Sequence, residues 1–254
     1  MWKSFLLTLF LGSFVGCPIV STAQAAPLAW YSVDGVVTTV NSSFWFEDLG
    51  YHYLGYAVSN SQFSLTASAT GKVDPYLSYD LTVANRTGET HSYAFGVSTP
   101  ITPITTRNEV SSFFAGSMTD ASGDGVTVAP QGPDYDLDGV VEMQANFVNG
   151  FPIGFPNPTG TNMGIDVGLG YSLPAGLQGQ SVDIGGMVSG PQPGLLGEWT
   201  ELGSVISFSL TGQRDHVTLN GQVVINPVPE PETILLLGLG LVGMSAAHRR
   251  RRRV

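Results

Sequence analysis

The chain has 254 residues, of which only 12% are charged and 32 are glycine, and this composition excludes long salt-bridged helices. Between residues 26 and 226 there are four basic and 18 acidic residues. We therefore expect no nucleic-acid binding, because basic patches hold phosphate backbones. A single domain of this length can bury a sizeable core.

The N-terminus has the composition of a secretory signal peptide over residues 1–25. One lysine precedes an apolar stretch from Phe5 to Val15, and the small residues Ala23 and Ala25 follow. This pattern predicts cleavage after Ala25. The single cysteine, Cys17, would leave with the peptide, so the exported chain would fold without disulfides. An alternative is that Cys17 is a lipidated first residue, although Phe14 is bulkier than a lipobox prefers.

Beyond residue 25, apolar residues recur at every second position between turn residues, which is typical of half-buried strands. We predict about ten strands and no amphipathic helix, and hence an all-β, antiparallel β-sandwich of jelly-roll-like form over residues 26–226. Stretches 150–161, 174–179 and 190–197 are rich in glycine and proline and are predicted to be irregular loops. Alternation is clearest at residues 77–83, 93–97, 141–147, 165–171 and 206–210, with further strands predicted at 33–40, 63–69, 110–118, 182–188 and 217–225.

An aromatic-rich stretch lies near the start of this body. Aromatic rings on a rigid sheet can stack on the apolar faces of a sugar, so a glycan-binding surface is one interpretation. Core packing is the other. Because Trp45 is out of phase with its two aromatic neighbours, we expect one face of this strand to present a ring away from the core. The rings are Phe44, Trp45, Phe46, Tyr51, Tyr53 and Tyr56.

Residues 134–145 carry the strongest metal-like pattern in the chain. Three aspartates occupy positions 1, 3 and 5 of a calcium loop, and Gly139 occupies the sharp turn at position 6. Position 12 is Ala145 instead of a bidentate glutamate, and a glutamate at position 9 could compensate. Calcium is thus the candidate cofactor, and an ordinary Asp-Gly hairpin turn is the alternative. The candidate ligands are Asp134, Asp136, Asp138 and Glu142.

A weaker copy of the same pattern comes fourteen residues earlier. Asp120, Ser122 and Asp124 match positions 1, 3 and 5, and Gly125 matches position 6. An Asp-Gly hairpin turn is again the alternative, since this dipeptide readily adopts a positive φ. Both segments therefore allow either a calcium-binding turn or a simple hairpin.

Patterns of catalytic residues are absent from the sequence, and we expect no enzyme activity. His52, His91, His216 and His248 lack the spacing of a zinc-binding helix, and no Gly-x-Ser-x-Gly elbow occurs. Adjacent carboxylates, such as Glu198 with Glu201 or Glu47 with Asp48, leave a polysaccharide-active hydrolase as an alternative.

The last 28 residues, PVPEPETILLLGLGLVGMSAAHRRRRRV, consist of three parts. The first contains Pro229 and Pro231, which disfavour both helix and sheet pairing. The apolar run Ile234–Ala247 is shorter than the ~20 residues of a standard membrane span. We nevertheless expect a transmembrane helix over about 233–248, because the following arginines would hold its end on the cytoplasmic side. These are Arg249, Arg250, Arg251, Arg252 and Arg253.

This order of Val228-Pro229-Glu230-Pro231, an apolar run and an arginine cluster resembles the PEP-CTERM sorting signal of Gram-negative bacteria. The resemblance covers residues 227–254. It implies export through the secretion translocon, transient anchoring in the inner membrane, and recognition of the motif by an exosortase, a processing enzyme.

Proteins that resemble this one in their tail tend to accompany production of exopolysaccharide and biofilm matrix. The resemblance therefore implies a structural or adhesive role at the cell surface or in the extracellular matrix. The residues of the body leave a calcium- or glycan-binding module open as the alternative.

Overall fold

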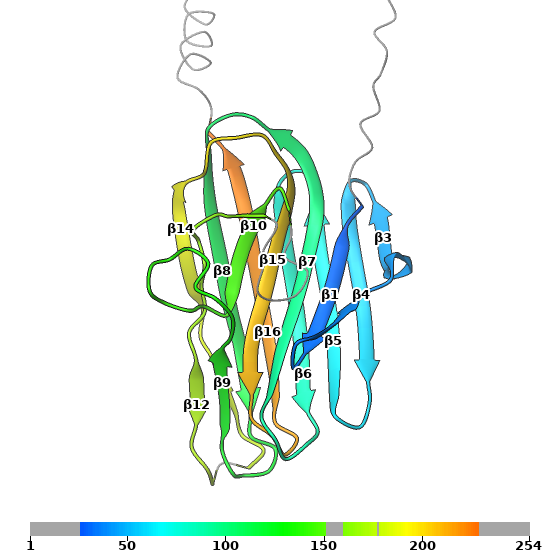
Figure 1. The fold of residues 1–254 in the computed structure, drawn as a ribbon, viewed down its shortest axis with the longest axis vertical. Helices are drawn as coiled ribbons and strands as arrows, with labels where there is room; N and C mark the ends of the chain where they lie inside the picture. Colours follow the sequence, from blue (N-terminus) through cyan, green and yellow to red (C-terminus); the bar gives the residue numbers. More distant parts are fainter. Residues whose placement is uncertain (1–25, 151–159, 177, 229–254) are drawn as a thin grey trace, which may run out of the picture.

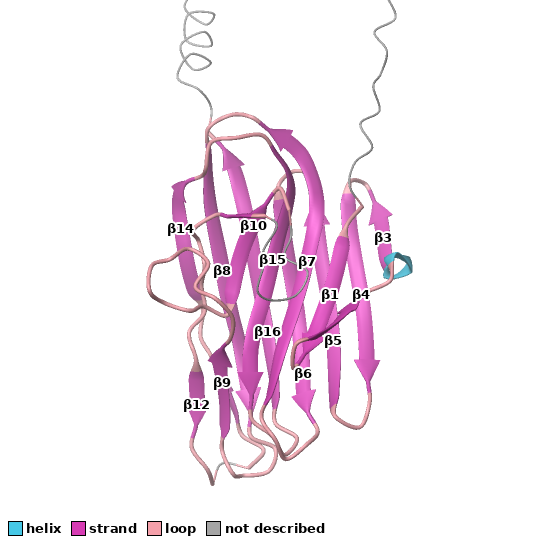
Figure 2. Ribbon diagram, in the orientation of Figure 1, coloured by secondary structure: helices cyan, strands magenta, loops and turns pink. Residues whose placement is uncertain are grey.

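The computed structural model describes residues 26–150, 160–176 and 178–228, and these residues form an all-β protein. Helix within these ranges is limited to one short turn, η1 (Ser42–Phe44). Figure 2 shows strands of both sheets running along the long axis of the molecule. The prediction of an all-β, antiparallel body is confirmed.

One sheet runs in the order β11-β10-β15-β7-β1-β2, with β9 beside another part of β15 and β12 beside β9. All of its pairings are antiparallel. Its strands are β1 (Leu28–Val33), β2 (Val36–Thr39), β7 (His91–Ile104), β9 (Val126–Pro130), β10 (Gln144–Val148), β11 (Thr161–Asn162), β12 (Tyr171–Leu173) and β15 (Trp199–Leu210).

The other sheet runs in the order β13-β8-β16-β6-β5-β4-β3, and β14 pairs with a second part of β8. It is antiparallel throughout as well. Its strands are β3 (Trp45–Asp48), β4 (Tyr51–Ser59), β5 (Phe63–Lys72), β6 (Tyr76–Asn85), β8 (Asn108–Thr119), β13 (Ser181–Asp183), β14 (Met187–Pro193) and β16 (His216–Pro227).

The two sheets lie face to face as two layers and share one apolar core (Figure 1). Along β6, Leu77, Tyr79, Leu81 and Val83 are buried, whereas Asp80 between them is exposed. The same period of two buries alternate residues of β5 and β16. Alternation in the sequence therefore identified the inner face of this sheet, while the jelly-roll-like topology stays a prediction.

A second, smaller apolar cluster covers the outer face of the first sheet. It contains Trp30, Ala94, Ala145, Phe147 and Val205. β7 and β15 are consequently buried on both faces over much of their length. A strand buried on both sides loses the simple alternation of a half-buried strand.

β10 differs from its predicted orientation. Alternation over residues 141–147 predicted that Ala145 and Phe147 face the main core, but both belong to the outer cluster. Gln144 and Asn146 are fully buried on the other side of the strand. There the Tyr79 hydroxyl donates to Gln144 Oε1 at 2.7 Å, and the Ser204 hydroxyl donates to Asn146 Oδ1 at 2.6 Å. These polar side chains are tolerated inside because each has hydrogen-bond partners.

Four predicted segments need correction. The strand expected over 182–188 is divided between β13 and β14. The strand expected over 33–40 is a hairpin, because Asp34 and Gly35 adopt φ values of 50° and 81° and reverse the chain. The strand expected over 165–171 is absent apart from a single bridge between Val167 and Gln144 and the first residue of β12, Tyr171. The loop expected over 190–197 is in part β14, since its backbone pairs with the edge of β8.

The described residues contain no helix long and apolar enough to cross a membrane. The predicted signal peptide with Ala23 and Ala25, the predicted membrane helix at 233–248 and the arginines at 249–253 all lie outside these residues.

Gly221 of β16 leaves room for the buried contact between Tyr79 and Gln144, because an added Cβ would meet the atoms of both side chains. We expect Gly221→Ala to lower the free energy of unfolding by about 1–3 kcal/mol through overpacking, and hence to lower Tm by several degrees. Gly55→Ala is the matched control, since nothing lies within 4 Å of a Cβ at that exposed position of β4. Equal melting temperatures for the two variants would contradict this packing account.

Candidate functional site

The acidic segment predicted to bind calcium is a loop that leaves the edge of the first sheet between β9 and β10. These two strands do not pair with each other; both pair with β15, at Phe208–Leu210 and Leu202–Ile206 respectively. The Asp138–Gly139 turn therefore joins no hairpin, and that alternative is wrong. The Asp124–Gly125 hairpin is wrong too, because β8 and β9 belong to different sheets.

An aromatic ring fixes this loop to the body. Tyr135 packs against the outer apolar cluster, and its ring meets Phe147 edge-on with centroids 5.1 Å apart. Burial raises the pKa of Tyr135, as expected for a phenol removed from water. Asp134 and Asp136 flank this ring in the sequence, so the anchor restricts where their carboxylates lie.

Hydrogen bonds to the backbone shape the tip of the loop. Asp134 accepts the N–H groups of Leu137 at 2.7 Å and Gly139 at 2.8 Å. Asp138 accepts the N–H of Val140 at 2.8 Å. Leu137 and Gly139 adopt positive φ angles of 64° and 94°. The hydrogen bonds from their N–H groups to Asp134 stabilise this turn.

The loop brings its carboxylates together in two overlapping groups. Oxygens of Asp134, Asp136 and Asp138 lie within 4.8 Å of one another, and so do oxygens of Asp136, Glu142 and Asp166. All four predicted ligands thus belong to one acidic cluster. Asp136 belongs to both groups and therefore links them.

Asp166 was not predicted, because it lies 24 residues beyond Glu142 in a segment expected to be a strand. It accepts the amide N–H of Asn162 at 2.8 Å and the backbone N–H of Asn146 at 3.2 Å. The side chain of Asn146 in turn binds Ser204 inside the main core. Asp166 is therefore positioned by the body of the protein and not by the loop.

Crowding and burial disfavour the charged forms of these acids. Burial, together with the neighbouring carboxylates, raises the pKa of Glu142 from 4.5 to about 7. Burial likewise raises the pKa of Asp166 from 3.8 to about 7, against the opposing hydrogen bond from Asn162. Like charges held this close are stabilised by either a proton or a cation. Carboxylate oxygens in this number suit a hard cation such as calcium.

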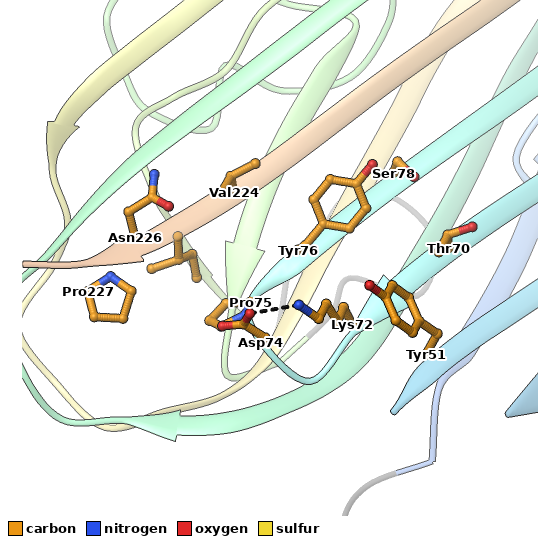
Figure 3. A pocket seen from close by; sticks show the side chains of 11 residues that line it. Tyr51, Thr70, Lys72, Asp74, Pro75, Tyr76, Ser78, Val224, Asn226 and Pro227 are labelled. Carbon is orange, nitrogen blue, oxygen red and sulfur yellow. Dashed lines mark hydrogen bonds and ion pairs between the residues drawn. The ribbon is translucent and has the colours of Figure 1, made fainter. Parts of the chain in front are cut away.

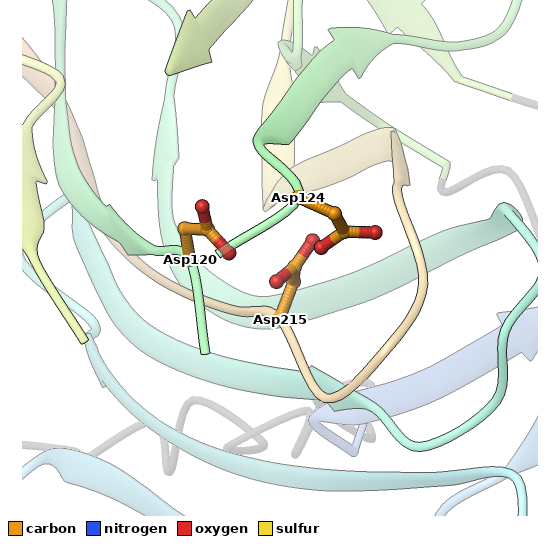
Figure 4. A group of neighbouring side chains, drawn as sticks. All are labelled: Asp120, Asp124 and Asp215. Carbon is orange, nitrogen blue, oxygen red and sulfur yellow. The ribbon is translucent and has the colours of Figure 1, made fainter. Parts of the chain in front are cut away.

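A second acidic group lies where the β8–β9 and β15–β16 connections meet (Figure 4). Asp120 is fully buried and accepts the N–H groups of Gly123 at 2.6 Å and Gly125 at 2.9 Å. Asp215, also fully buried, accepts the Thr211 hydroxyl at 2.9 Å. Oxygens of Asp120, Asp124 and Asp215 lie within 4.8 Å of one another. The two fully buried carboxylates hold the β8–β9 and β15–β16 connections together, since Asp215 also accepts the N–H of Ala121, and this favours a structural role for these turns.

Asp215 was also missed by the sequence analysis, and no local pattern could have found it. It lies 91 residues beyond Asp124, in the connection between the two long strands β15 and β16. Burial raises its pKa, with Asp120 and Asp124 adding to the effect and the Thr211 hydroxyl opposing it. The predicted Asp120, Ser122 and Asp124 do lie on one turn, where the Ser122 hydroxyl contacts Asp124.

A hydroxyl, an imidazole and a carboxylate are aligned near the start of β7. The Thr87 hydroxyl lies 2.8 Å from His91 Nε2, and His91 Nδ1 lies 2.6 Å from Asp34 Oδ2. The same hydroxyl also bonds Asn85 Oδ1 at 3.0 Å, an acceptor that takes the Thr87 N–H as well. This arrangement closes a turn, so we assign no nucleophile here and the absence of enzyme activity stays a prediction.

The aromatic stretch 44–56 divides between core and solvent as its phase predicted. Trp45 packs against the main core, whereas Phe46 is 64% exposed on the next residue. Tyr56 also packs against the core, and Phe44 meets its ring edge-on at 5.2 Å. Tyr53 is 38% exposed and lies opposite Phe46 on the neighbouring strand. An exposed aromatic row therefore exists at the edge formed by β3 and β4.

The predicted sorting motif begins where the fold ends. β16 ends at Pro227, and Val228 is the last described residue, with its N–H donating to Arg107 O at 2.9 Å. Pro229, Glu230 and Pro231 lie outside the described residues.

The raised pKa values predict how stability depends on pH when calcium is chelated. Folded Glu142 and Asp166 keep protons that the unfolded chain has released, so the free energy of unfolding should fall as pH rises from about 5 to about 7. Urea unfolding in excess chelator measures this slope. Glu142→Gln should flatten it, and Asp183→Asn, at an exposed acid of β13, should not. A Glu142→Gln slope equal to that of the wild type would contradict the assignment.

Comparisons with known proteins identify the tail. A family model described as the PEP-CTERM protein-sorting motif matches residues 227–252. No curated protein matches the chain. Solved structures that match include three from infectious bursal disease virus: the Gx strain, the VP2 subviral particle and the Gt strain.

These three structures are 10%, 11% and 12% identical to this chain, with TM-scores of 0.13, 0.12 and 0.09. The matches cover 90%, 85% and 83% of this chain and 69%, 52% and 64% of the viral chains. Scores this low carry no argument about fold or function. The motif, in contrast, confirms the resemblance seen in the sequence: the chain carries a PEP-CTERM sorting signal, which implies an exported protein that is anchored in a membrane and then processed by an exosortase.

Proposed function

We propose that this protein acts at the cell surface or in the extracellular matrix as a structural or adhesive component linked to exopolysaccharide. The single observation that carries the proposal is the sorting motif at residues 227–252. The fold supports it, because a two-layer body with one large apolar core has no need of disulfides to stay folded outside the cell.

The position of the chain ends also supports this role. The start of β1 and the end of β16 lie at the same end of the sandwich (Figure 1). A body attached through its C-terminal end would therefore extend its opposite end and both outer sheet faces away from the attachment point. Its excess of acidic residues would keep it soluble and would repel anionic surfaces.

Replacing Pro229, Glu230 and Pro231 together by alanine should abolish processing. We expect the unprocessed protein to accumulate in the inner-membrane fraction, since the processing enzyme would no longer recognise its substrate. Immunoblots of fractionated cells measure both size and location. Glu232→Ala, just outside the motif, is the matched control. Normal size and surface location of the triple variant would refute sorting by this motif.

Calcium binding is a second candidate function, favoured by two groups of three carboxylates that share Asp136. The cation would neutralise acids that otherwise share protons, and oxygen ligands are what calcium prefers. Asp134, Asp136, Asp138, Glu142 and Asp166 would hold it. The role would be structural, fixing the loop over the outer apolar cluster.

Saturating calcium should raise the melting temperature of the purified chain relative to excess chelator, because ligand binding to the folded state stabilises it. Ten times the dissociation constant corresponds to about 1.4 kcal/mol, or a few degrees for a chain of this size. Asp136→Asn should remove this shift, and Asp183→Asn should retain it. A melting curve that is the same in calcium and in chelator would exclude a stabilising calcium site.

A further inference from the structure

The outer face of the second sheet carries a row of exposed aromatic rings beside a groove. At the β3–β4 edge, Phe46 and Tyr53 have ring centroids 6.3 Å apart, and Tyr51 stacks on Tyr53 at 5.9 Å with an interplanar angle of 18°. Phe46 is 64% exposed and Tyr53 is 38% exposed. Aromatic surface left in water at this density, with the rings of Tyr51 and Tyr53 nearly parallel, is suited to stacking against a flat apolar face of a ligand.

The groove adjoins this row and has a volume of about 510 Å³ (Figure 3). Residues of four neighbouring strands and the β5–β6 turn line it, so its floor is the sheet itself and is rigid. Hydroxyl and amide groups lie beside the rings in this lining. Among the lining residues are Tyr51, Thr70, Lys72, Tyr76, Ser78 and Asn226.

Strand register explains how rings and polar groups come to alternate across the face. Tyr53 lies opposite Thr70, and Thr70 lies opposite Ser78 on the next strand. In the adjacent row, Tyr51 lies opposite Lys72, and Lys72 lies opposite Tyr76. Neighbouring strands are about 4.8 Å apart, so each row places a ring and a hydrogen-bonding group side by side. A ligand lying across the strands would meet both.

Charge indicates which kind of polymer fits. The charged side chains in the lining are Lys72 and Asp74, and they pair with each other at 2.8 Å, with Lys72 also lying 5.6 Å above the Tyr51 ring. The groove is thus close to neutral on a protein that is otherwise strongly acidic. A neutral ligand matches the groove, whereas a polyanion would be repelled by the rest of the surface.

Stabilisation of the sheet edge by the aromatic rings explains less of this arrangement than ligand binding does. Cross-strand aromatic pairs do stabilise a sheet edge, but rings that only pack would gain more from burial than from exposure. The acidic loop does not serve this face, because it covers the outer face of the other sheet. Sugars combine apolar ring faces with hydroxyls at their rims, which is the chemistry that rings flanked by Thr70, Ser78 and Asn226 would recognise.

We propose that this groove binds a neutral polysaccharide, with Tyr51 and Tyr53 stacking on its sugar rings and the neighbouring hydroxyl and amide groups bonding its rim hydroxyls. The inference deepens the proposed function and rests on it for biological context, since it supplies the contact through which a surface protein would adhere to matrix.

The test is co-sedimentation of the purified full-length chain, in a detergent without a sugar headgroup, with insoluble β-1,4-glucan, β-1,3-glucan and chitin. We expect saturable binding to at least one of these, unaffected by chelator. Tyr53→Ala should weaken it about fivefold to tenfold, because a stacking contact of this kind is worth about 1 kcal/mol or slightly more. Tyr53→Phe should bind as the wild type does, since the ring is retained.

Leu196→Ala controls for the loss of exposed apolar surface, because Leu196 is 87% exposed away from the groove, and its binding should be unchanged. Melting curves of every variant check that the fold is intact. No saturable binding to any of the three polymers, or equal binding by Tyr53→Ala and wild type, would overturn the proposal. Cell fractionation tests the proposed function separately. A protein that binds no glycan would still reach the cell surface if the sorting motif is recognised.

Discussion

Apolar side chains on the facing sides of β5, β6, β7, β15 and β16 pack against one another between two sheets, and the other features of this protein depend on that contact. The core is continuous from one end of the sandwich to the other. Burying it fixes the strand register, and the register fixes which side chains face outward in the same row. Loops are then held wherever a strand leaves the sheets, so both acidic groups lie at such exits. The core thus acts as the rigid support on which weaker polar arrangements are built.

The buried polar contacts within this core link it to the acidic loop. Tyr79, Gln144, Asn146 and Ser204 hydrogen-bond across the sheets, and the backbone of Asn146 also binds Asp166. Burying polar side chains destabilises the fold unless each of them is hydrogen-bonded. These contacts therefore favour the one orientation of β10 in which all of them form. That arrangement turns Ala145 and Phe147 outward, where Phe147 meets Tyr135 of the loop. Core and loop are therefore coupled through a single short strand.

The two outer faces of the sandwich have different chemistry. On one face the acidic loop packs through Tyr135 against an apolar cluster, and the other face carries rings beside hydroxyls along a groove. Such a division allows a cation to stabilise one face while the other contacts a polymer. The sorting motif follows the end of β16 directly, so the processing enzyme would act next to the folded body. The tail therefore carries the sorting signal, and the two outer faces of the body carry the candidate binding sites.

The sequence by itself determined the features that depend only on residues close together in the chain. Alternation along residues 77–83 and 206–210 identified buried strand faces, the phase of Trp45 indicated that one face of its strand presents a ring away from the core, and the tail identified the sorting signal. Only the tertiary structure decided which distant residues meet. Asp166 joins Glu142, Asp215 joins Asp124, and Tyr79 meets Gln144, because the folding of the two sheets brings together segments that are far apart in the chain. The orientation of β10 was also beyond local pattern, since alternation cannot distinguish one buried face from another when both sides of a strand are covered.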